Sequence, residues 1–392
     1  MHGDLLRNDI IKAKKLLICL LFGLICTACS QESDPENTPV AAGGPKRLFI
    51  IGQDLSAIRD YHASSCCLEP DGNTAYISLY NILSKEAVFS GLGIDEKGTP
   101  LDIEYDSGAG TGNVWKTATE FTGGLAIGLE MTENNHPDAL NRLIAGQYDQ
   151  HIAHLALFLK KINEPVWLRI GYEFDGVWNQ GYQDAEKYKT AYRHVFDRLR
   201  EAQVANVEYV WQSSTSPVDD LIDGRRENIS KWYPGDDYVD WMGTSMFLGL
   251  DEKSAANPDS KTPSQRELTD EMLEFARQRG KPVMIAEASP QGYDLAAGFR
   301  ANIAPIWDGP QKADLKELSD AEIWQQWYAP LFQYMNENAD VIRALAYINV
   351  NWDAQARWGA PHAEGYWGDS RLQANAEIAK RFNQAMLEWR GR

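Results

Sequence analysis

Two glutamates stand where apolar stretches of the chain end, and this placement is the clearest chemical signal in the sequence. Glu173 ends the stretch PVWLRIGYE, and Glu287 lies near the end of KPVMIAEASP. Each follows at least four mostly apolar residues, so a carboxylate there is costly unless it is paired or used. One interpretation is a buried ion pair, for instance between Glu173 and Arg169. The other is a catalytic pair, in which one carboxyl is acid and base and the other is nucleophile.

The elements that must position these glutamates alternate along the chain from Arg47 onward. The runs between strands predict helices at 138–162, 184–202 and 264–280, and the last begins with a capping-box pattern, Ser264 and Glu267, and ends on Gly280. Most of the strand candidates are apolar on both faces, which is typical of a parallel sheet covered by helices. Strands are predicted at 47–54, 123–131, 165–173, 207–214, 238–247, 281–290 and 342–353, with one more between 70 and 95, in TAYISLYN or AVFSGLGID.

About eight strands with helices between them predict an α/β fold, a single (β/α)8 TIM barrel over residues 47–392. A doubly wound open sheet is the alternative, although no glycine-rich phosphate loop follows the first strand, which disfavours a nucleotide-binding version. In a barrel, the carboxyl ends of the strands face the active site. Polar and aromatic residues gather at these ends: Gln53, Asp54, Glu130, Tyr172, Glu173, Trp211, Gln212, Ser245, Phe247, Glu287, Asn351, Trp352 and Asp353.

The stretch LRIGYEFDGVW, residues 168–178, resembles glycoside hydrolase family 26, whose motif runs Arg, three residues, Glu, then Gly and Trp. Arg169, Glu173, Gly176 and Trp178 match it at the same spacing. The resemblance implies a retaining glycosidase of the large barrel clan that carries its glutamates after strands four and seven. Glu173 would then be the acid and base and Glu287 the nucleophile, with no cofactor and no metal. We expect substrate contacts from Arg169, Tyr172, Trp178, Trp211, Gln53, Glu130, Phe247 and Trp352.

The sequence departs from the family pattern at two places. Tyr172 stands where the family usually has His, and Met246 and Phe247 stand where a Tyr usually follows strand six. The resemblance implies endo-acting cleavage of a β-linked polysaccharide of the β-mannan, β-1,3-xylan or β-glucan type. A transglycosylase that uses the same two glutamates is one alternative. A non-catalytic glycan-binding lipoprotein on a barrel scaffold is another.

Residues 1–28 are expected to be a lipoprotein signal peptide. A basic segment, KAKK, precedes LLICLLFGLIC, an apolar stretch too short to span a bilayer. The sequence Thr27-Ala28-Cys29 resembles a bacterial lipobox, so Cys29 is expected to carry lipid, with residues 29–46 as a flexible tether. This predicts a protein anchored at the bacterial cell envelope, on the outer membrane or cell surface. A secreted or periplasmic protein is the alternative.

The charge and composition narrow the range of partners. A net charge of −18 argues against nucleic acid, because an acidic surface repels phosphate backbones, and a neutral polysaccharide or oligosaccharide fits better. The 13 Trp and 17 Tyr supply rings that stack on sugars or pack in the core. Cys66 and Cys67, the two cysteines after the leader, lack metal-site spacing and are interpreted as structural thiols. We expect a monomer that meets a membrane only through its lipid anchor.

Overall fold

The computed structural model describes residues 46–84, 91–106, 108–217, 229–252, 263–301, 315–358 and 367–391. The expected signal peptide, Cys29 and all of the expected tether except Lys46 lie outside the described residues. The described residues belong to one compact unit, Gly44–Arg392. Within them, no helix is both long enough and apolar enough to cross a membrane.

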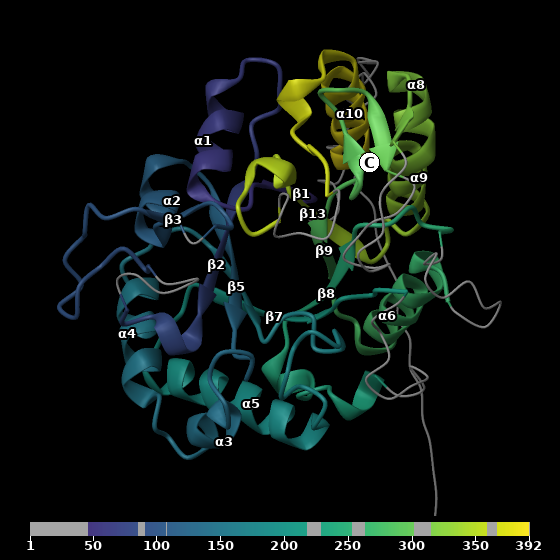
Figure 1. Ribbon diagram of the computed structural model, residues 1–392. Coiled ribbons are helices and arrows are strands. Elements are labelled where there is room, and N and C mark those ends of the chain that lie inside the picture. Colours follow the sequence, from purple (N-terminus) through teal and green to yellow (C-terminus); the bar gives the residue numbers. More distant parts are fainter. Residues whose placement is uncertain are drawn as a thin grey trace, which may run out of the picture. The chain divides into compact units, whose positions relative to one another are not determined.

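Eight parallel strands close into a barrel in the order β1-β13-β9-β8-β7-β6-β5-β2, with helices around it (Figure 1). The closure confirms the (β/α)8 prediction and rules out the open sheet. The strand predicted between residues 70 and 95 is β2, which contains TAYIS, the start of the candidate stretch TAYISLYN. The strands are β1 (Leu48–Ile51), β2 (Gly72–Ser78), β5 (Gly124–Glu130), β6 (Val166–Ile170), β7 (Val207–Ser213), β8 (Trp241–Met246), β9 (Val283–Ala288) and β13 (Ile342–Tyr347).

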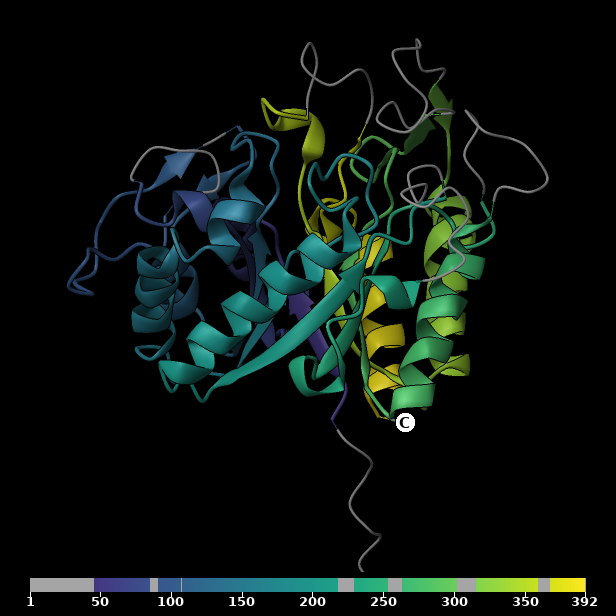
Figure 2. The same ribbon diagram turned by 90° about the horizontal axis from the view of Figure 1, so that it is seen from below.

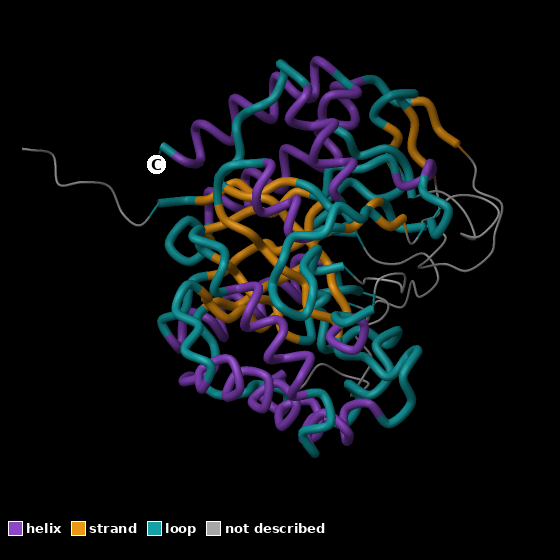
Figure 3. Tube along the Cα trace, turned by 90° about the vertical axis from the view of Figure 1, so that its left-hand side faces the viewer, coloured by secondary structure: helices purple, strands orange, loops and turns teal. Residues whose placement is uncertain are grey.

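The helices lie outside the barrel (Figure 3). The helix predicted at 264–280 is confirmed, because α6 has the Ser264–Glu267 capping box and ends on Gly280 in the left-handed conformation. The described helices are α1 (Leu55–Ala63), α2 (Val114–Glu120), α3 (Ala139–Ile144), α4 (Asp149–Leu159), α5 (Ala185–Glu201), α6 (Gln265–Arg279), α8 (Asp320–Ile323), the π-helical turn η4 (Trp324–Tyr328), α9 (Ala329–Glu337) and α10 (Ala376–Arg390).

The single helix predicted at 138–162 is wrong, because the chain forms α3 and α4 there. Gly146, at φ +78°, follows the end of α3, and its backbone N–H donates to the carbonyl of Leu143. The N–H of Gln147 donates to the carbonyl of Arg142. These two bonds form a Schellman motif, which ends a helix by turning the chain away.

Alternation along the strands separates two apolar layers. Val166, Leu168 and Ile170 of β6 pack in the layer between barrel and helices, whereas Trp167 belongs to the smaller core inside the barrel. Period-two alternation therefore also directs the Arg169 side chain inward, above Trp167 and toward the mouth. Small alanines such as Ala126, Ala286, Ala344 and Ala346 fill much of the rest of the barrel interior.

Short elements surround the mouth formed by the carboxyl ends of the strands, at the top of Figure 2. The sequence did not predict them. Two small antiparallel sheets consist of β3 (Tyr105–Asp106) with β4 (Thr111–Gly112), and of β10 (Tyr293–Asp294), β11 (Phe299–Ala301) and β12 (Leu315–Glu317). The described 3-10 turns do not all lie at the mouth, since η3 directly precedes β8 at the other end of the barrel: η1 (Leu79–Asn81), η2 (Ile229–Lys231), η3 (Asp236–Tyr238), η5 (Trp352–Ala354) and η6 (Leu372–Ala374).

Candidate active site

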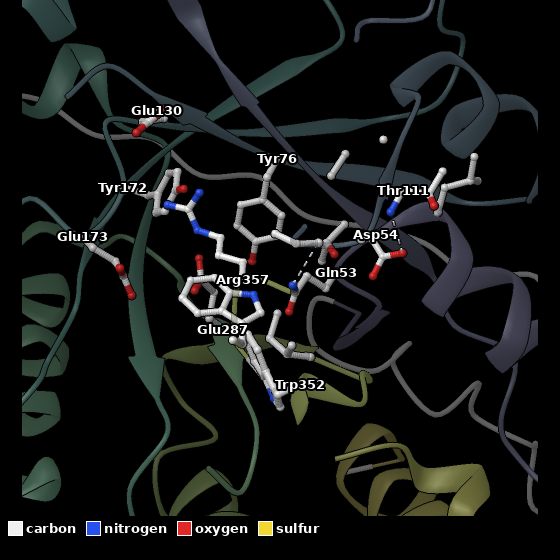
Figure 4. Close-up of a pocket in the computed structure, with 18 of the residues that line it drawn as sticks. Gln53, Asp54, Tyr76, Thr111, Glu130, Tyr172, Glu173, Glu287, Trp352 and Arg357 are labelled. Carbon is white, nitrogen blue, oxygen red and sulfur yellow. Dashed lines mark hydrogen bonds between the residues drawn. The ribbon is translucent and has the colours of Figure 1, made fainter. Parts of the chain in front are cut away.

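A cleft with a volume of about 470 Å³ opens at the carboxyl ends of the strands (Figure 4). Glu173 and Glu287 both line it. Six of the eight predicted substrate contacts also lie in its wall, and their contact with substrate stays a prediction: Gln53, Glu130, Tyr172, Trp178, Phe247 and Trp352.

A strained backbone turn carries Glu173 into the cleft. Glu173 follows β6 by three residues and has a φ of +57°, a left-handed conformation that costs a non-glycine residue about 1–3 kcal/mol. Hydrogen bonds on both sides hold the turn in place. The carbonyl of Glu173 accepts from Asn179 Nδ2 at 2.8 Å and from the Gly176 N–H at 3.0 Å, and the next N–H, of Phe174, donates to the carbonyl of Gln212 at 3.2 Å.

A β-bulge in β9 aims Glu287 at the same cleft. Against β8, Thr244 pairs with Ile285 but the next residue, Ser245, pairs with Glu287, so β9 has one extra residue at Ala286. Strict alternation would direct Glu287 to the face opposite Ala286, which points into the barrel. The extra residue re-aims the side chain, as bulges near active sites commonly do.

Arg169 lies beneath the cleft and pairs with the candidate nucleophile. Its Nη1 is 2.5 Å from Glu287 Oε1, and the Arg169 side chain has no exposed surface. The prediction that Arg169 contacts substrate is therefore wrong, because the guanidinium is covered by the barrel. An ion pair between Arg169 and Glu173 is also not what forms, since the short contact is to Glu287.

Two tyrosine rings and one glycine enclose the Arg169 guanidinium. It lies 4.8 Å from the ring centroid of Tyr76 and 5.3 Å from that of Tyr172, within cation–π range. A Cβ at Gly128 of β5 would come within 2.9 Å of Arg169 Nη2 and 2.7 Å of the Tyr76 ring. Any larger residue at position 128 would displace the group that holds Glu287.

Gln212 and Ser245 connect the two glutamates. Arg169 Nη1 donates to Gln212 Oε1 at 3.0 Å, and Gln212 Nε2 donates to Ser245 Oγ at 3.0 Å. Ser245 Oγ then donates to Glu173 Oε1 at 2.8 Å. The sequence placed both linking residues at strand ends, where the site was expected, but assigned neither of them a role in it.

Trp211 is the second correction among the predicted substrate contacts. Its ring is fully buried between barrel and helices and stacks on Phe174, with centroids 4.4 Å apart and planes 6° apart. Because side chains alternate along β7, the next residue, Gln212, faces inward instead. The expected position was therefore wrong by one residue.

Burial and charge set the protonation of the Glu173 side chain. Removal from water raises the pKa of Glu173 well above its usual range, and the negative charge of Glu287 raises it further. The hydrogen bond from Ser245 acts in the opposite direction. The net effect favours the protonated form of Glu173, which is the form that a general acid needs.

Asp175 holds the turn that carries Glu173, a role that was not predicted from the sequence. Its carboxylate is buried, accepts from the Ser214 N–H at 2.6 Å and also accepts from Ser213 Oγ. Both serines lie at the end of β7, so Asp175 ties the Glu173 turn to the neighbouring strand. Burial raises the pKa of Asp175.

Trp178 lies in the cleft wall beyond Glu173. A Cβ at Gly176 would come within 2.6 Å of its indole ring, so glycine at 176 lets the ring fold back over the chain. This contact explains why glycine and tryptophan occur together after the glutamate. The ring lines the cleft, and its stacking on a sugar stays a prediction.

A polar cluster lies across Tyr76 from the two glutamates in the view of Figure 4. Gln53 Nε2 donates to Gln355 Oε1 at 3.2 Å, and Gln355 Nε2 donates to Asp54 Oδ2 at 3.0 Å. The Thr111 N–H donates to Asp54 Oδ1 at 3.3 Å. Burial raises the pKa of Asp54 to about 6, although backbone N–H donors partly oppose this effect.

Among the residues that the structure describes, no group of three or more His, Cys, Asp or Glu side chains is arranged to hold a metal ion.

Comparison with known proteins gives a consistent set of relatives. Residues 110–260 match the model of glycosyl hydrolase family 26. The chain is 33% identical over 344 residues to a β-1,3-xylanase of Vibrio sp., covering 87% of this chain and 65% of the relative. It is 33% identical over 342 residues to a β-1,3-xylanase of Alcaligenes sp., covering 86% and 63%. The chain thus spans slightly less than two thirds of the length of these relatives.

Structural comparison agrees on the fold. A GH26 β-mannanase of Bacteroides ovatus superposes with a TM-score of 0.52 at 15% identity, covering 86% of this chain and 88% of that chain. At this identity the likeness concerns the fold alone. Together with the match of residues 110–260 to the family model and with the closed barrel, these comparisons show that the chain is similar to members of glycosyl hydrolase family 26.

Proposed function

We propose that the chain is a retaining, endo-acting glycoside hydrolase that cleaves a β-linked polysaccharide by double displacement. The observation that carries the proposal is the arrangement of the two glutamates in one cleft. Glu287 is paired with the buried Arg169, whereas Glu173 is held where its protonated form is favoured. Two carboxyls in opposite protonation states are what the acid and the nucleophile of a retaining glycosidase require.

In the first step, Glu287 attacks the anomeric carbon while Glu173 gives its proton to the departing glycosidic oxygen. The carbon–oxygen bond to the leaving sugar breaks as the ester bond to Glu287 forms. Arg169 keeps the Glu287 carboxylate in place through Oε1 until the ester forms. The product is a glycosyl-enzyme ester, a free sugar chain and an ionised Glu173.

In the second step, the ionised Glu173 takes a proton from water while the water oxygen attacks the same carbon. The ester bond breaks, and Glu287 leaves as a carboxylate. Because the ester is uncharged, the repulsion that raised the pKa of Glu173 is absent in the intermediate, so Glu173 can act as a base. Two inversions at one carbon give net retention.

We propose β-1,3-xylan as the substrate. The support is that two relatives at 33% identity are β-1,3-xylanases. The alternatives are β-mannan and β-glucan.

A panel assay tests both the reaction and the substrate. Purified protein is incubated with β-1,3-xylan, β-mannan, mixed-linkage β-glucan and β-1,4-xylan, and reducing ends and product lengths are followed. We expect β-1,3-xylan to be cleaved, with oligosaccharides of several lengths as the first products, as endo action requires. Binding without any new reducing ends would favour the non-catalytic glycan-binding lipoprotein. Chain lengthening at high acceptor concentration would favour the transglycosylase.

Variants of the two glutamates test their roles. Glu287→Ala should abolish turnover, and added azide should not restore a product with retained configuration. Glu173→Ala should spare substrates with an activated aryl leaving group, which needs no protonation, and azide should then yield a β-glycosyl azide. A separation of about 5–5.5 Å between the two carboxyls, as retention requires, stays a prediction.

We further propose that the mature chain is a monomer that begins at a lipidated Cys29 and is anchored at the cell envelope. The support is the basic and apolar leader, Thr27-Ala28-Cys29 and the polar stretch that follows. In this arrangement residues 29–46 tether the barrel, so the cleft could reach a polysaccharide outside the membrane.

A further inference from the structure

We infer that Gln212 and Ser245 are positioning residues for the acid. A directed chain of hydrogen bonds that starts at Arg169 runs through both of them and holds the catalytic proton on Oε2 of Glu173. The inference rests on the proposed function, because it assigns the proton that Glu173 transfers. Both residues are fully buried and absent from the cleft wall, so neither can touch substrate.

The direction of the chain is set at Arg169. A guanidinium carries only donors, so the Gln212 atom that faces Nη1 at 3.0 Å must be the amide oxygen. The amide nitrogen of Gln212 then points the other way, toward Ser245 Oγ at 3.0 Å and Glu287 Oε1 at 3.4 Å. An amide flip would face two donor groups toward each other and is excluded by Arg169.

The same reasoning orients the Ser245 hydroxyl. Its oxygen accepts the hydrogen of Gln212, and its own hydrogen is directed at Glu173 Oε1, 2.8 Å away. If the acid proton were on Oε1, the Ser245 hydrogen would lose its acceptor inside a buried site, which is disfavoured. The proton of the acid therefore belongs on Oε2, the oxygen that Ser245 does not touch.

The series of hydrogen bonds also stabilises the ionised form of Glu173. The charged groups around Glu173 come from several elements: Glu287 of β9 and Asp175 of its own turn repel its negative charge, and Arg169 of β6 attracts it. Glu130 and Arg357 line the same cleft. Among these surroundings, Ser245 is the hydroxyl that donates directly to the Glu173 carboxylate, so it favours the ionised form that the second step uses.

The test compares Ser245→Ala with a matched control. Loss of the donor should raise the midpoint of Glu173 ionisation by about one to two pH units, as expected for a hydrogen bond to a charged group. Ser245→Thr keeps a hydroxyl and should restore the native midpoint. Thr244→Val is the control: Thr244 is the neighbouring residue of β8, is equally buried, and its hydroxyl has no partner among the described residues.

Two readouts separate this inference from the proposed function. In the first, kcat/KM is measured against pH on a xylooligosaccharide and on a 2,4-dinitrophenyl glycoside. Ser245→Ala should move the alkaline limb upward on the oligosaccharide, which needs the acid, and leave that limb unmoved on the aryl substrate. The second is an infrared titration of the Glu173 carboxyl, taken as the difference between each protein and its Glu173→Gln counterpart, and it needs no turnover.

An unchanged midpoint in Ser245→Ala would overturn the inference, even if activity or stability fell. An equal shift in Thr244→Val would also overturn it, because the effect would then be a general loosening of β8. If Ser245→Ala fails to fold, Ser245→Cys replaces it, and its weaker donor should give a smaller shift of the same sign. A protein that hydrolyses no polysaccharide but shows the predicted infrared shifts would refute the proposed function and leave the inference standing.

Discussion

Replacing Arg169 with Met should expose the cost of a buried, unpaired charge under the cleft. Arg169 is 0% exposed and Glu287 is 8% exposed at the side chain, and their atoms are 2.5 Å apart. Removing one partner of such a pair typically costs about 3–5 kcal/mol, because the other charge stays buried. After the substitution, Gln212 Nε2 remains as a donor to Glu287 Oε1 among the described residues, at the long distance of 3.4 Å.

Urea unfolding of a double-mutant cycle measures this effect. Arg169→Met alone should lose about 3–5 kcal/mol of the free energy of unfolding. Adding Glu287→Gln should recover part of the loss, because it removes the orphaned charge. Arg381→Met breaks an exposed pair with Glu377 on α10 and should lose only about 0.3–0.5 kcal/mol. Additive losses in the double variant would refute the coupling between Arg169 and Glu287.

Three further predictions concern other parts of the chain. Trp178→Ala should weaken binding of a long oligosaccharide by about 1–3 kcal/mol, and calorimetry on the Glu173→Gln background checks this; an unchanged Kd would put Trp178 outside the binding surface. Because the pKa of Asp54 is about 6 in the folded protein against 3.8 as the reference, its ionisation costs stability as pH rises through that window. Asp54→Asn keeps an N-cap residue but removes the group that ionises. Its free energy of unfolding in urea should therefore gain about 1–3 kcal/mol relative to the native protein between pH 4 and pH 7; a difference that does not change with pH would contradict this. Cys29→Ser should release the protein from membranes, and a variant that stays in the membrane fraction would refute lipidation.

The barrel could be predicted because its strands are buried on both faces. Runs such as VWLRI and VMIAEA are too apolar for a sheet with one wet face, so they indicate parallel strands covered by helices. The break between α3 and α4 was missed because the apolar stripe continues past Gly146. A glycine within a helical pattern is a weak signal until its left-handed φ is seen.

The two glutamates could be predicted because a carboxylate at the end of a buried strand has few structural uses. The groups that support them could not be predicted in the same way. Which of Trp211 and Gln212 faces the barrel interior depends on where β7 begins, and strand boundaries are uncertain by a few residues from sequence alone. The bulge at Ala286 changes the facing of Glu287 and leaves no mark in the pattern of residue types.

The role of Arg169 could be predicted only in part. Its place in the family-like motif predicted that Arg169 belongs to the site, but not that its side chain lies below Glu287 and away from substrate. The burial of Arg169 follows from closure of the barrel, because an inward side chain one layer below the mouth is covered on every side. Ser245 was expected at a strand end, but its role could not be predicted, because serine is common there and its bond to Glu173 joins residues 72 positions apart.

Trapping the covalent intermediate tests whether Glu287 is the nucleophile of a retaining glycosidase. A 2-deoxy-2-fluoro xylobioside with an activated aryl leaving group is incubated with the protein, because the fluorine slows both steps and the activated leaving group restores the rate of the first, so that the ester accumulates. The labelled protein is then digested and the modified residue is located by mass spectrometry. We expect one fluoroglycosyl group, attached to Glu287. A label on Glu173 or another carboxylate, or release of the inverted sugar with no label, would contradict it.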